Sequence, residues 1–452
     1  MRRAVLEKDW TKGSITGNLL SLSWPIIISS SLSMIGPTID IIWVGKLGAA
    51  SLAGVGISGL AIQLITGVTI GLFTAMRAMV ARFIGAGDTK GANHVMQQAF
   101  VIGAIFSVFI AAIGIFLAKQ ILIVFGVKPD VVAEGAAYMR IQLIGVVTLY
   151  LIHTNEAAMQ ASGDAVTPMR IAILTRLFHA VLGPFLIFGW WIFPRFGVTG
   201  AAVTNILAQV LGGSVGLWFL LSGRTRLRLT FKDFHLDKNI LWRLAKVGIP
   251  NSLANTQRTF PFIAMVWFVA PFGTAALAAY SVVTRVDAFL RTPAAALGQS
   301  SGILTGQNLG ASQPERAEKS GWLAAGLFTA LMVILSVAIW FWAEHIARVF
   351  NTEPAVVEVA VTFLRIGIVS YLTFGAVLVL SWSIEGVGDT MPGLLATILT
   401  LWLVQMPLAY FLPKFTSLGV SGVQWAVAFA LIGRAIIFST YFKLGMWKHK
   451  KV

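Results

Sequence analysis

Long apolar runs recur along the whole chain, and short polar breaks separate them. A helix that crosses a bilayer needs about 20 predominantly apolar residues, and each of these runs approaches or exceeds that length. The pattern predicts spans near 18–44, 51–79, 94–123, 135–161, 168–189, 199–222, 244–270, 276–304, 320–349, 357–384, 392–412 and 419–442. We therefore expect an all-α membrane protein with twelve transmembrane helices.

The second half of the chain repeats the first at an offset of 225 residues, from Pro25 to Pro250. Further pairs in this register are Gly48 with Gly273, Phe125 with Phe350, Pro129 with Pro354, and Gly163-Asp164 with Gly388-Asp389. An even number of spans per repeat gives both halves the same orientation. We expect two pseudo-symmetric six-helix bundles, an N-lobe over 1–222 and a C-lobe over 244–452, joined by a cytoplasmic linker over 223–243.

Charge supports this membrane topology. Only 12% of residues are charged while 57% are hydrophobic, and the net charge is +16. Outside the spans, one side of the predicted membrane holds just four basic residues, Lys46, Lys128, Arg195 and Lys414. Because basic loops stay in the cytoplasm, we expect a cell-membrane protein with the linker and both termini inside. The positive charge is then explained without a nucleic-acid partner.

The linker sequence LTFKDFHLDKNILWRL has the composition of an amphipathic helix. Its Lys and Arg residues would face the anionic inner leaflet. Because the chain has no cysteine, disulfides and Cys-based metal sites are excluded.

Asp40 lies in the middle of the first apolar run. A carboxylate at this depth costs several kcal/mol unless it is protonated, paired or facing water. Its counterpart in the repeat is Met265, so the acid is not needed to build the fold. We expect Asp40 to have a functional role. The alternative is a structural role, in which nearby hydroxyl or backbone groups bond to the carboxylate.

Two pseudo-symmetric lobes are typical of a transporter, because a cavity between such lobes opens to either side by rocking. No segment resembles a channel selectivity filter. The sequence also lacks a phosphate loop, a nucleophile motif and a metalloprotease pattern, so we expect no enzyme activity and no cofactor.

Several motifs in a fixed order resemble the multidrug and toxic compound extrusion (MATE) family, in particular its DinF-like prokaryotic branch. They are VGKLG after the acid-bearing first span, GAGD and GASQ after the second span of each half, SGDAVTP and GVGDTMP after the fourth, and RVDAFLRTPAAALGQSSGILTGQNLGA at 285–311. The resemblance implies cation-coupled export of amphipathic, often cationic compounds. It also assigns Asp40 to the cation site of the N-lobe.

The fifth span departs from this family pattern. DinF-like members carry Asn and, four residues later, Asp before a proline, whereas this chain has His179 and Gly183. The fourth span offers His153, Asn155 and Glu156 instead, and helical spacing places His153 and Glu156 on one face. We expect a relocated site of Asp40, Glu156 and His179, with His153 and Asn155 nearby.

Imidazole groups titrate near neutral pH, and Na⁺ prefers oxygen ligands, so this site favours H⁺ over Na⁺ as the coupling ion. Two rival interpretations remain open. One is a transition-metal site formed by the two histidines and two carboxylates, although no recognised ligand motif supports it and we expect no metal. The other is an ordinary core role for His179, bonded to backbone or to Arg176.

The C-lobe carries its own candidates, Asp287, Glu385 and Gln257. Asp287 precedes Arg291 by four residues, so a neutral ion pair is the simpler interpretation. Glu385 ends the tenth span and could lie at the membrane interface. Gln257 and Arg258 lie midway along the seventh span.

Together these features predict a monomeric multidrug efflux antiporter that works by alternating access on small amphipathic substrates within the lipid bilayer. The alternative is a flippase for lipids or lipid-linked oligosaccharides from the same wider superfamily. Such flippases usually have two further spans and several cavity arginines, and Arg176, Arg258 and Arg291 keep this alternative open.

Overall fold

The computed structural model describes residues 8–232 and 234–450, without the side chains of 258–263. The described chain is helical and divides into two compact units. The first unit runs up to Asp9 and continues over Trp24–Lys246, and the second holds Trp10–Ser23 together with the chain from Val247 onward. In each repeat, therefore, the start of the first long helix is grouped with the other half.

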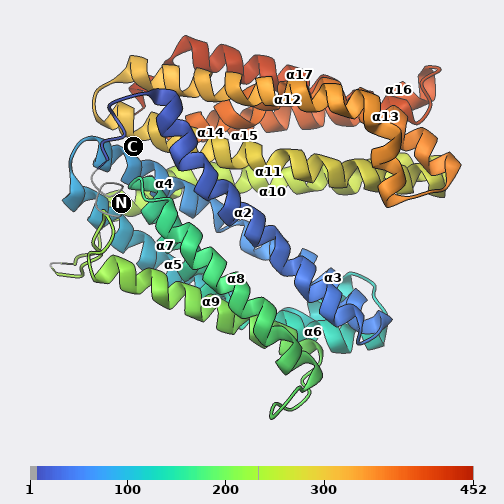
Figure 1. Ribbon diagram of the computed structural model, residues 1–452, viewed down its shortest axis with the longest axis horizontal. Helices are drawn as coiled ribbons and strands as arrows, with labels where there is room; N and C mark the ends of the chain where they lie inside the picture. The colour runs from blue at the N-terminus through green and yellow to red at the C-terminus, as the bar shows by residue number, and fades with distance from the viewer. Residues whose placement is uncertain (1–7, 233, 451–452) are drawn as a thin grey trace. The chain divides into compact units, whose positions relative to one another are not determined.

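In the described part of the chain, eight helices precede the linker and carry the first repeat (Figure 1). They are α2 (Ile15–Gly45), α3 (Ala49–Gly67), α4 (Ile70–Gly85), α5 (Thr89–Val124), α6 (Pro129–Ile144), α7 (Val146–Ala161), α8 (Val166–Phe188) and α9 (Val198–Leu221). Helix α3 packs against α6, α5 against α6, and α8 against α9. Small and aliphatic side chains such as Ala118, Leu122 and Met139 fill the space between them.

The second repeat follows the same order. Its elements are α10 (Lys238–Val269), η1 (Ala270–Phe272), α11 (Thr274–Gly310), α12 (Pro314–Phe350), α13 (Pro354–Phe374), η2 (Gly375–Val379), α14 (Leu380–Glu385), α15 (Met391–Ile398), η3 (Leu399–Gln405), α16 (Met406–Phe415), α17 (Ser421–Leu444) and η4 (Met446–His449). The segments η2 and η3 are π-helical turns inside longer helical stretches. Helix α12 packs against α11 and α13.

Every predicted span coincides with a helix or with a broken pair of helices. Nine helical stretches of the described chain are long and apolar enough to cross a membrane, and a tenth is the pair α6–α7, which bends by 48°. Helices α10 and α11 are not among these stretches, and the second predicted span is divided between α3 and α4. The chain is an all-α membrane protein, while the count of twelve spans stays a prediction.

The repeated Gly-Asp pair has a structural explanation. Gly163 and Gly388 both have positive φ, at 96° and 86°, which glycine adopts without the strain of a side chain. The following Asp164 accepts a hydrogen bond from the Thr167 backbone N–H at the start of α8. Its counterpart Asp389 instead pairs with Lys450, at 2.9 Å. The same turn thus ends the fourth predicted span of each half.

Among the described residues of LTFKDFHLDKNILWRL, only the last seven, from Lys238 onward, are helical, and they are the start of α10. The described linker residues before Lys238 are non-helical, and Leu227 and Leu229 are buried in the first unit. Helix α10 begins at Lys238 because Asp237 Oδ1 accepts hydrogen bonds from the Asn239 and Ile240 backbone N–H groups. Preceding backbone groups bond to side chains of α5, which replaces the hydrogen bonds of a helix.

Gly386 and Gly302 lie at the closest approach of α14 and α11. A Cβ built on Gly386 would lie 2.4 Å from both Cα and the carbonyl oxygen of Gly302. Neither backbone segment can shift to relieve this clash unless a whole helix moves. We expect Gly386→Ala to lower the free energy of unfolding by about 1–3 kcal/mol or more. Thermal unfolding in detergent micelles measures this loss.

Gly326→Ala is the matched control, because nothing lies within 4 Å of a Cβ at this position of α12. Alanine is the better helix former by about 1 kcal/mol, so this variant should be as stable as the wild type or more so. Equal stability of the two variants would contradict the proposed close contact.

Candidate cation-coupling site

A cavity of about 570 Å³ lies within the first unit. Residues of α2, α3, α6, α7, α8 and α9 line it. Its wall mixes apolar and polar side chains, and the acidic and basic ones come from three helices, namely Asp40, His153, Glu156, Arg176 and His179. The residues predicted for the N-lobe site therefore share one cavity.

Asp40 and His179 are in direct contact. Asp40 lies on α2 and His179 on α8, and His179 Nε2 is 3.1 Å from Asp40 Oδ1. Only 2% of Asp40 and 1% of His179 is exposed, so water screens the pair little. The carboxylate at membrane depth thus has an imidazole as its partner.

Arg176 decides which ring nitrogen of His179 carries the proton. Arg176 Nη1 lies 3.4 Å from His179 Nδ1, three residues along α8. A guanidinium only donates, so Nδ1 accepts and the proton of the neutral ring lies on Nε2, facing Asp40. This arrangement turns Nε2–H toward the carboxylate, 3.1 Å from Oδ1, in a contact that lacks the geometry of a hydrogen bond.

Gly36 makes room for this guanidinium. A Cβ built on Gly36 would lie 1.8 Å from Arg176 Nη1, so no other residue could leave the arginine in its present place. Pro37 follows directly and removes a backbone hydrogen bond from α2. Arg176 therefore contacts α2 next to the point where Pro37 leaves a backbone hydrogen bond of this helix unmade.

A chain of side-chain hydrogen bonds reaches the other oxygen of Asp40. Thr148 Oγ1 donates to Gln209 Oε1 (2.8 Å), and Gln209 Nε2 donates to Asn205 Oδ1 (2.6 Å). Asn205 Nδ2 then donates to Asp40 Oδ2 at 3.4 Å. The amides of α9 are thereby oriented with their donors toward the carboxylate.

Glu156 has different partners. Its Oε2 lies 3.5 Å from His153 Nδ1, and its Oε1 accepts a hydrogen bond from Gln160 Nε2 at 2.8 Å. Asn155 points elsewhere, because its Nδ2 donates to the Gly213 carbonyl and joins α7 to α9. The predicted cluster is thus two pairs, Asp40 with His179 and Glu156 with His153, along one cavity wall.

This division bears on the rival transition-metal site. Such a site needs all of its ligand atoms around one point. In the described part of the chain, the metal-ligand geometry is met by one other group, His94, His235 and Asp237, and not by the cavity residues.

The three candidate residues predicted for the C-lobe have different surroundings in the second unit. Glu385 is 3% exposed, so it is not the interfacial residue that its place at the span end suggested. Asn251 Nδ2 and Ser381 Oγ both donate to its carboxylate, at 2.9 and 2.8 Å. These bonds join α10 to α14 and explain Glu385 as a buried structural acid.

Asp287 lies on α11 within electrostatic range of Arg291 and Tyr371. The Arg291 guanidinium lies over the ring of Phe374, 4.9 Å from its centroid. Gln257 Oε1 is buried and makes no hydrogen bond with the described residues. The side chain of Arg258 lies outside the described residues. Asp287, Glu385 and Gln257 thus do not form the kind of cluster found around Asp40.

The amides of α9 were not predicted from the sequence, and the contact of Arg176 with His179 entered only as part of the rival interpretation of His179. Asn205 and Gln209 stand four residues apart in an otherwise apolar run, which places them on one helix face. Arg176 stands three residues before His179, also one helical turn away. Polar pairs at helical spacing were the signal that could have found them.

Comparison with known proteins agrees with this architecture. The MatE family profile matches residues 25–185 and again 250–411, and these segments begin at the two prolines that start the repeat. Probable multidrug resistance protein YoeA of Bacillus subtilis is 25% identical over 448 residues, covering 98% of this chain and 96% of YoeA. An FAD transporter of Shewanella oneidensis is 24% identical over 391 residues, covering 86% of each chain.

Solved structures show the same fold. A MATE protein crystallised in its bent conformation superposes with a TM-score of 0.90 at 23% identity, over 96% of each chain. A MOP-superfamily transporter from Pyrococcus furiosus superposes with a TM-score of 0.89 at 24% identity, over 98% of each chain. Because the profile matches both repeats and more than half of the sequence, this chain belongs to the MatE family of transporters.

Proposed function

We propose that this protein is a multidrug efflux antiporter that couples export of amphipathic, often cationic compounds to inward movement of H⁺. The observation that carries the proposal is the buried contact between Asp40 and His179 in a cavity of the first unit. Relatives such as YoeA and the NorM protein of Thermotoga maritima are named probable multidrug resistance proteins. Family membership supports transport, and the buried acid–imidazole pair supports protons as the coupling ion.

The geometry suggests how a proton drives the cycle. A proton bound to Asp40 Oδ1 meets the proton already on His179 Nε2, so the ring must turn or move its proton to Nδ1. His179 then no longer accepts from Arg176, and the guanidinium leaves its place beside Gly36. Helix α2 is released next to Pro37, bends and closes the cavity, which expels the substrate. Proton release to the cytoplasm resets the pair.

H⁺ is proposed over Na⁺ because of the ligands around Asp40. Na⁺ binds best among several hard oxygen atoms, but an imidazole occupies one side of this carboxylate. Gly183 supplies no second carboxylate, and the acid of α7 is paired with His153. A proton needs only one acceptor atom, which this buried acid–imidazole pair offers.

Proteoliposomes test the proposal. We expect ethidium or norfloxacin to be exported when a pH gradient alone is imposed, and not when a Na⁺ gradient alone is imposed. Transport driven only by Na⁺ would overturn the choice of ion. No gradient-driven transport of either drug by correctly folded protein would overturn the proposed function.

A second candidate, a flippase for lipid-linked oligosaccharides or other lipids, gains support from Arg176. This guanidinium lines the cavity and is chemically suited to a phosphate group. A relative is named an FAD transporter, and FAD carries a pyrophosphate. Movement of a fluorescent, phosphate-bearing lipid across the same liposomes, abolished by Arg176→Gln, would favour this function over drug export.

Glu156 provides a separate prediction. We expect Glu156→Gln to reduce drug export and alter its pH dependence, because the variant removes a titrating partner of His153. The effects of Glu156→Gln and His153→Asn should be non-additive, since each disrupts the same pair. Glu134→Gln, an exposed acid of α6, is the control and should transport normally. An unchanged pH profile in Glu156→Gln would exclude Glu156 from coupling.

The membrane topology is a further prediction. From the distribution of basic loops we propose that the linker and both termini face the cytoplasm of the cell membrane. Reporter fusions at residue 224 and at each terminus should be active only as cytoplasmic reporters. Fusions in the loops after Gly45 and after Phe188, which carry Lys46 and Arg195, should give the opposite result.

A further inference from the structure

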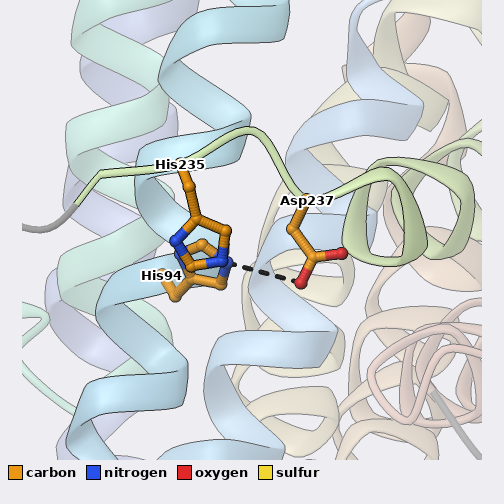
Figure 2. Close-up of side chains that lie close together, drawn as sticks. All are labelled: His94, His235 and Asp237. Carbon is orange, nitrogen blue, oxygen red and sulfur yellow. Dashed lines mark ion pairs between the residues drawn. The ribbon is translucent and has the colours of Figure 1, made fainter.

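The linker carries a cluster of ligating side chains that the coupling site does not use. His235 and Asp237 lie on the linker, and His94 lies on α5, in the first unit (Figure 2). One ligand atom from each residue lies within 4.8 Å of the other two. Figure 2 shows both imidazole rings beside one another and Asp237 facing them.

The spacing suits a small divalent ion. Zn²⁺ binds imidazole nitrogen at about 2.0–2.1 Å and carboxylate oxygen at about 2.0–2.2 Å, so tetrahedral ligand atoms lie roughly 3.4 Å apart. His94 Nε2 lies 3.5 Å from Asp237 Oδ2. The two imidazole rings have centroids 4.6 Å apart, so a small turn of the His235 side chain, which is exposed, completes the set.

A hydrogen bond to Gln97 orients the imidazole ring of His94 for binding a metal ion. His94 Nδ1 lies 3.2 Å from Gln97 Oε1, and Gln97 Nε2 in turn donates to the Thr230 carbonyl. The amide oxygen therefore accepts from Nδ1–H, and the lone pair of the neutral ring lies on Nε2, toward Asp237. Metal-binding histidines commonly donate their other N–H in this way. His94 Nε2 is buried and makes no hydrogen bond with the described residues.

Backbone hydrogen bonds likewise orient the carboxylate of Asp237. The backbone N–H groups of Asn239 and Ile240 both donate hydrogen bonds to its carboxylate. Both bonds are accepted by Oδ1, whereas Oδ2 is the oxygen that faces His94. The second oxygen is thus available to a cation.

A row of amides holds the linker against α5 around this cluster. Asn93 Nδ2 donates to the Thr230 carbonyl and its Oδ1 accepts from the Thr230 N–H. Gln98 Nε2 donates to the His235 carbonyl at 2.7 Å, and its Oε1 accepts from the Asp237 N–H at 3.3 Å. The backbone on each side of the two linker ligands is therefore fixed.

We propose that His94, His235 and Asp237 bind one divalent transition-metal ion, best matched by Zn²⁺, and that the ion fastens the linker to α5. Two neutral imidazoles and one carboxylate form a ligand set that suits zinc, with a fourth position left to water. The Irving–Williams order predicts that Ni²⁺ and Cu²⁺ also bind, and that Mg²⁺ and Ca²⁺, which prefer oxygen ligands, do not.

Calorimetric titration of the detergent-purified full chain with Zn²⁺ tests the proposal, with any polyhistidine tag removed. We expect one Zn²⁺ per chain in the wild type. His94→Ala, His235→Ala and Asp237→Asn should each weaken binding by about 100-fold or more, because even partners outside the ligand set contribute 10–100-fold. His345→Ala removes an exposed histidine of α12 and should bind as the wild type does.

Two results would overturn the site. The first is no Zn²⁺ binding by folded wild-type protein, which would leave His94 and Asp237 as a simple ion pair. The second is binding that survives in the three variants or disappears in His345→Ala. His235→Ala changes an exposed linker side chain, so misfolding should not obscure its result. Thermal unfolding of each variant without metal verifies this point.

Tryptic cleavage tests whether the ion fastens the linker. Lys232 and Lys238 flank the two linker ligands and are exposed. We expect Zn²⁺ to slow cleavage at these lysines in the wild type and in His345→Ala, and to have no effect in His235→Ala. Equal cleavage rates with and without Zn²⁺ in the wild type would contradict the fastening.

Discussion

Asp40→Asn is expected to reduce gradient-driven export to the level of empty liposomes while leaving the fold intact. Asparagine has the shape of aspartate but binds no proton, so the coupling step is lost. Its amide oxygen can still accept from Asn205, and its NH₂ group can donate to His179 Nε2 once the ring carries its proton on Nδ1, so each contact of Asp40 keeps a partner after this change of tautomer. We expect the free energy of unfolding to change by about 1 kcal/mol or less.

Drug efflux from proteoliposomes and thermal unfolding in micelles measure the two effects. Asp88→Asn is the matched control, since Asp88 is an exposed helix cap outside the cavity and asparagine caps equally well. This control should transport normally. Full pH-driven transport by Asp40→Asn would show that the acid has no part in coupling.

His179→Asn is expected to remove most of the pH dependence of transport, because an amide does not take up and release a proton as an imidazole does. The amide restores the residue type that the DinF-like pattern places here, and it fits the space of the imidazole. It can still donate to Asp40, but it neither accepts a proton from Asp40 nor passes one on. We expect transport to fall at least tenfold, which corresponds to about 1.4 kcal/mol.

His153→Asn serves as the comparison for this experiment. His153 lines the same cavity but is half-exposed and contacts Glu156 rather than Asp40. We expect its effect on the pH profile to be clearly smaller than that of His179→Asn. Identical pH profiles for the wild type and His179→Asn would identify His179 as an ordinary core histidine.

The sequence predicted the fold well because its signals are local. Apolar runs mark helices, and the paired Gly and Pro residues mark the turns of both repeats. Asp40 was equally visible, since an acid inside an apolar run is costly wherever the helix packs. The pairing of His153 with Glu156 followed from helical spacing alone, and the two side chains do lie together.

Contacts between distant segments could not be predicted in this way. The sequence could not show that Asp40 meets His179 rather than Glu156, because the choice depends on how α2, α7 and α8 rotate about their axes. The course of the linker was also hidden. Its composition suggested a helix, but side-chain amides of α5, more than 130 residues earlier in the chain, take up its backbone groups.

The hydrogen-bond chain from Thr148 to Asp40 makes the two carboxylate oxygens chemically unequal. Every member of the chain donates toward Oδ2, so a hydrogen on that oxygen would face the N–H of Asn205. A hydrogen on Oδ1 would face His179 Nε2 instead, and the imidazole can move its own proton to Nδ1, whereas the NH₂ group of Asn205 keeps both of its hydrogens. If H⁺ is the coupling ion, as proposed, the stereochemistry of this single acid predicts that the proton enters and leaves on the imidazole face of Asp40 and not on its amide face.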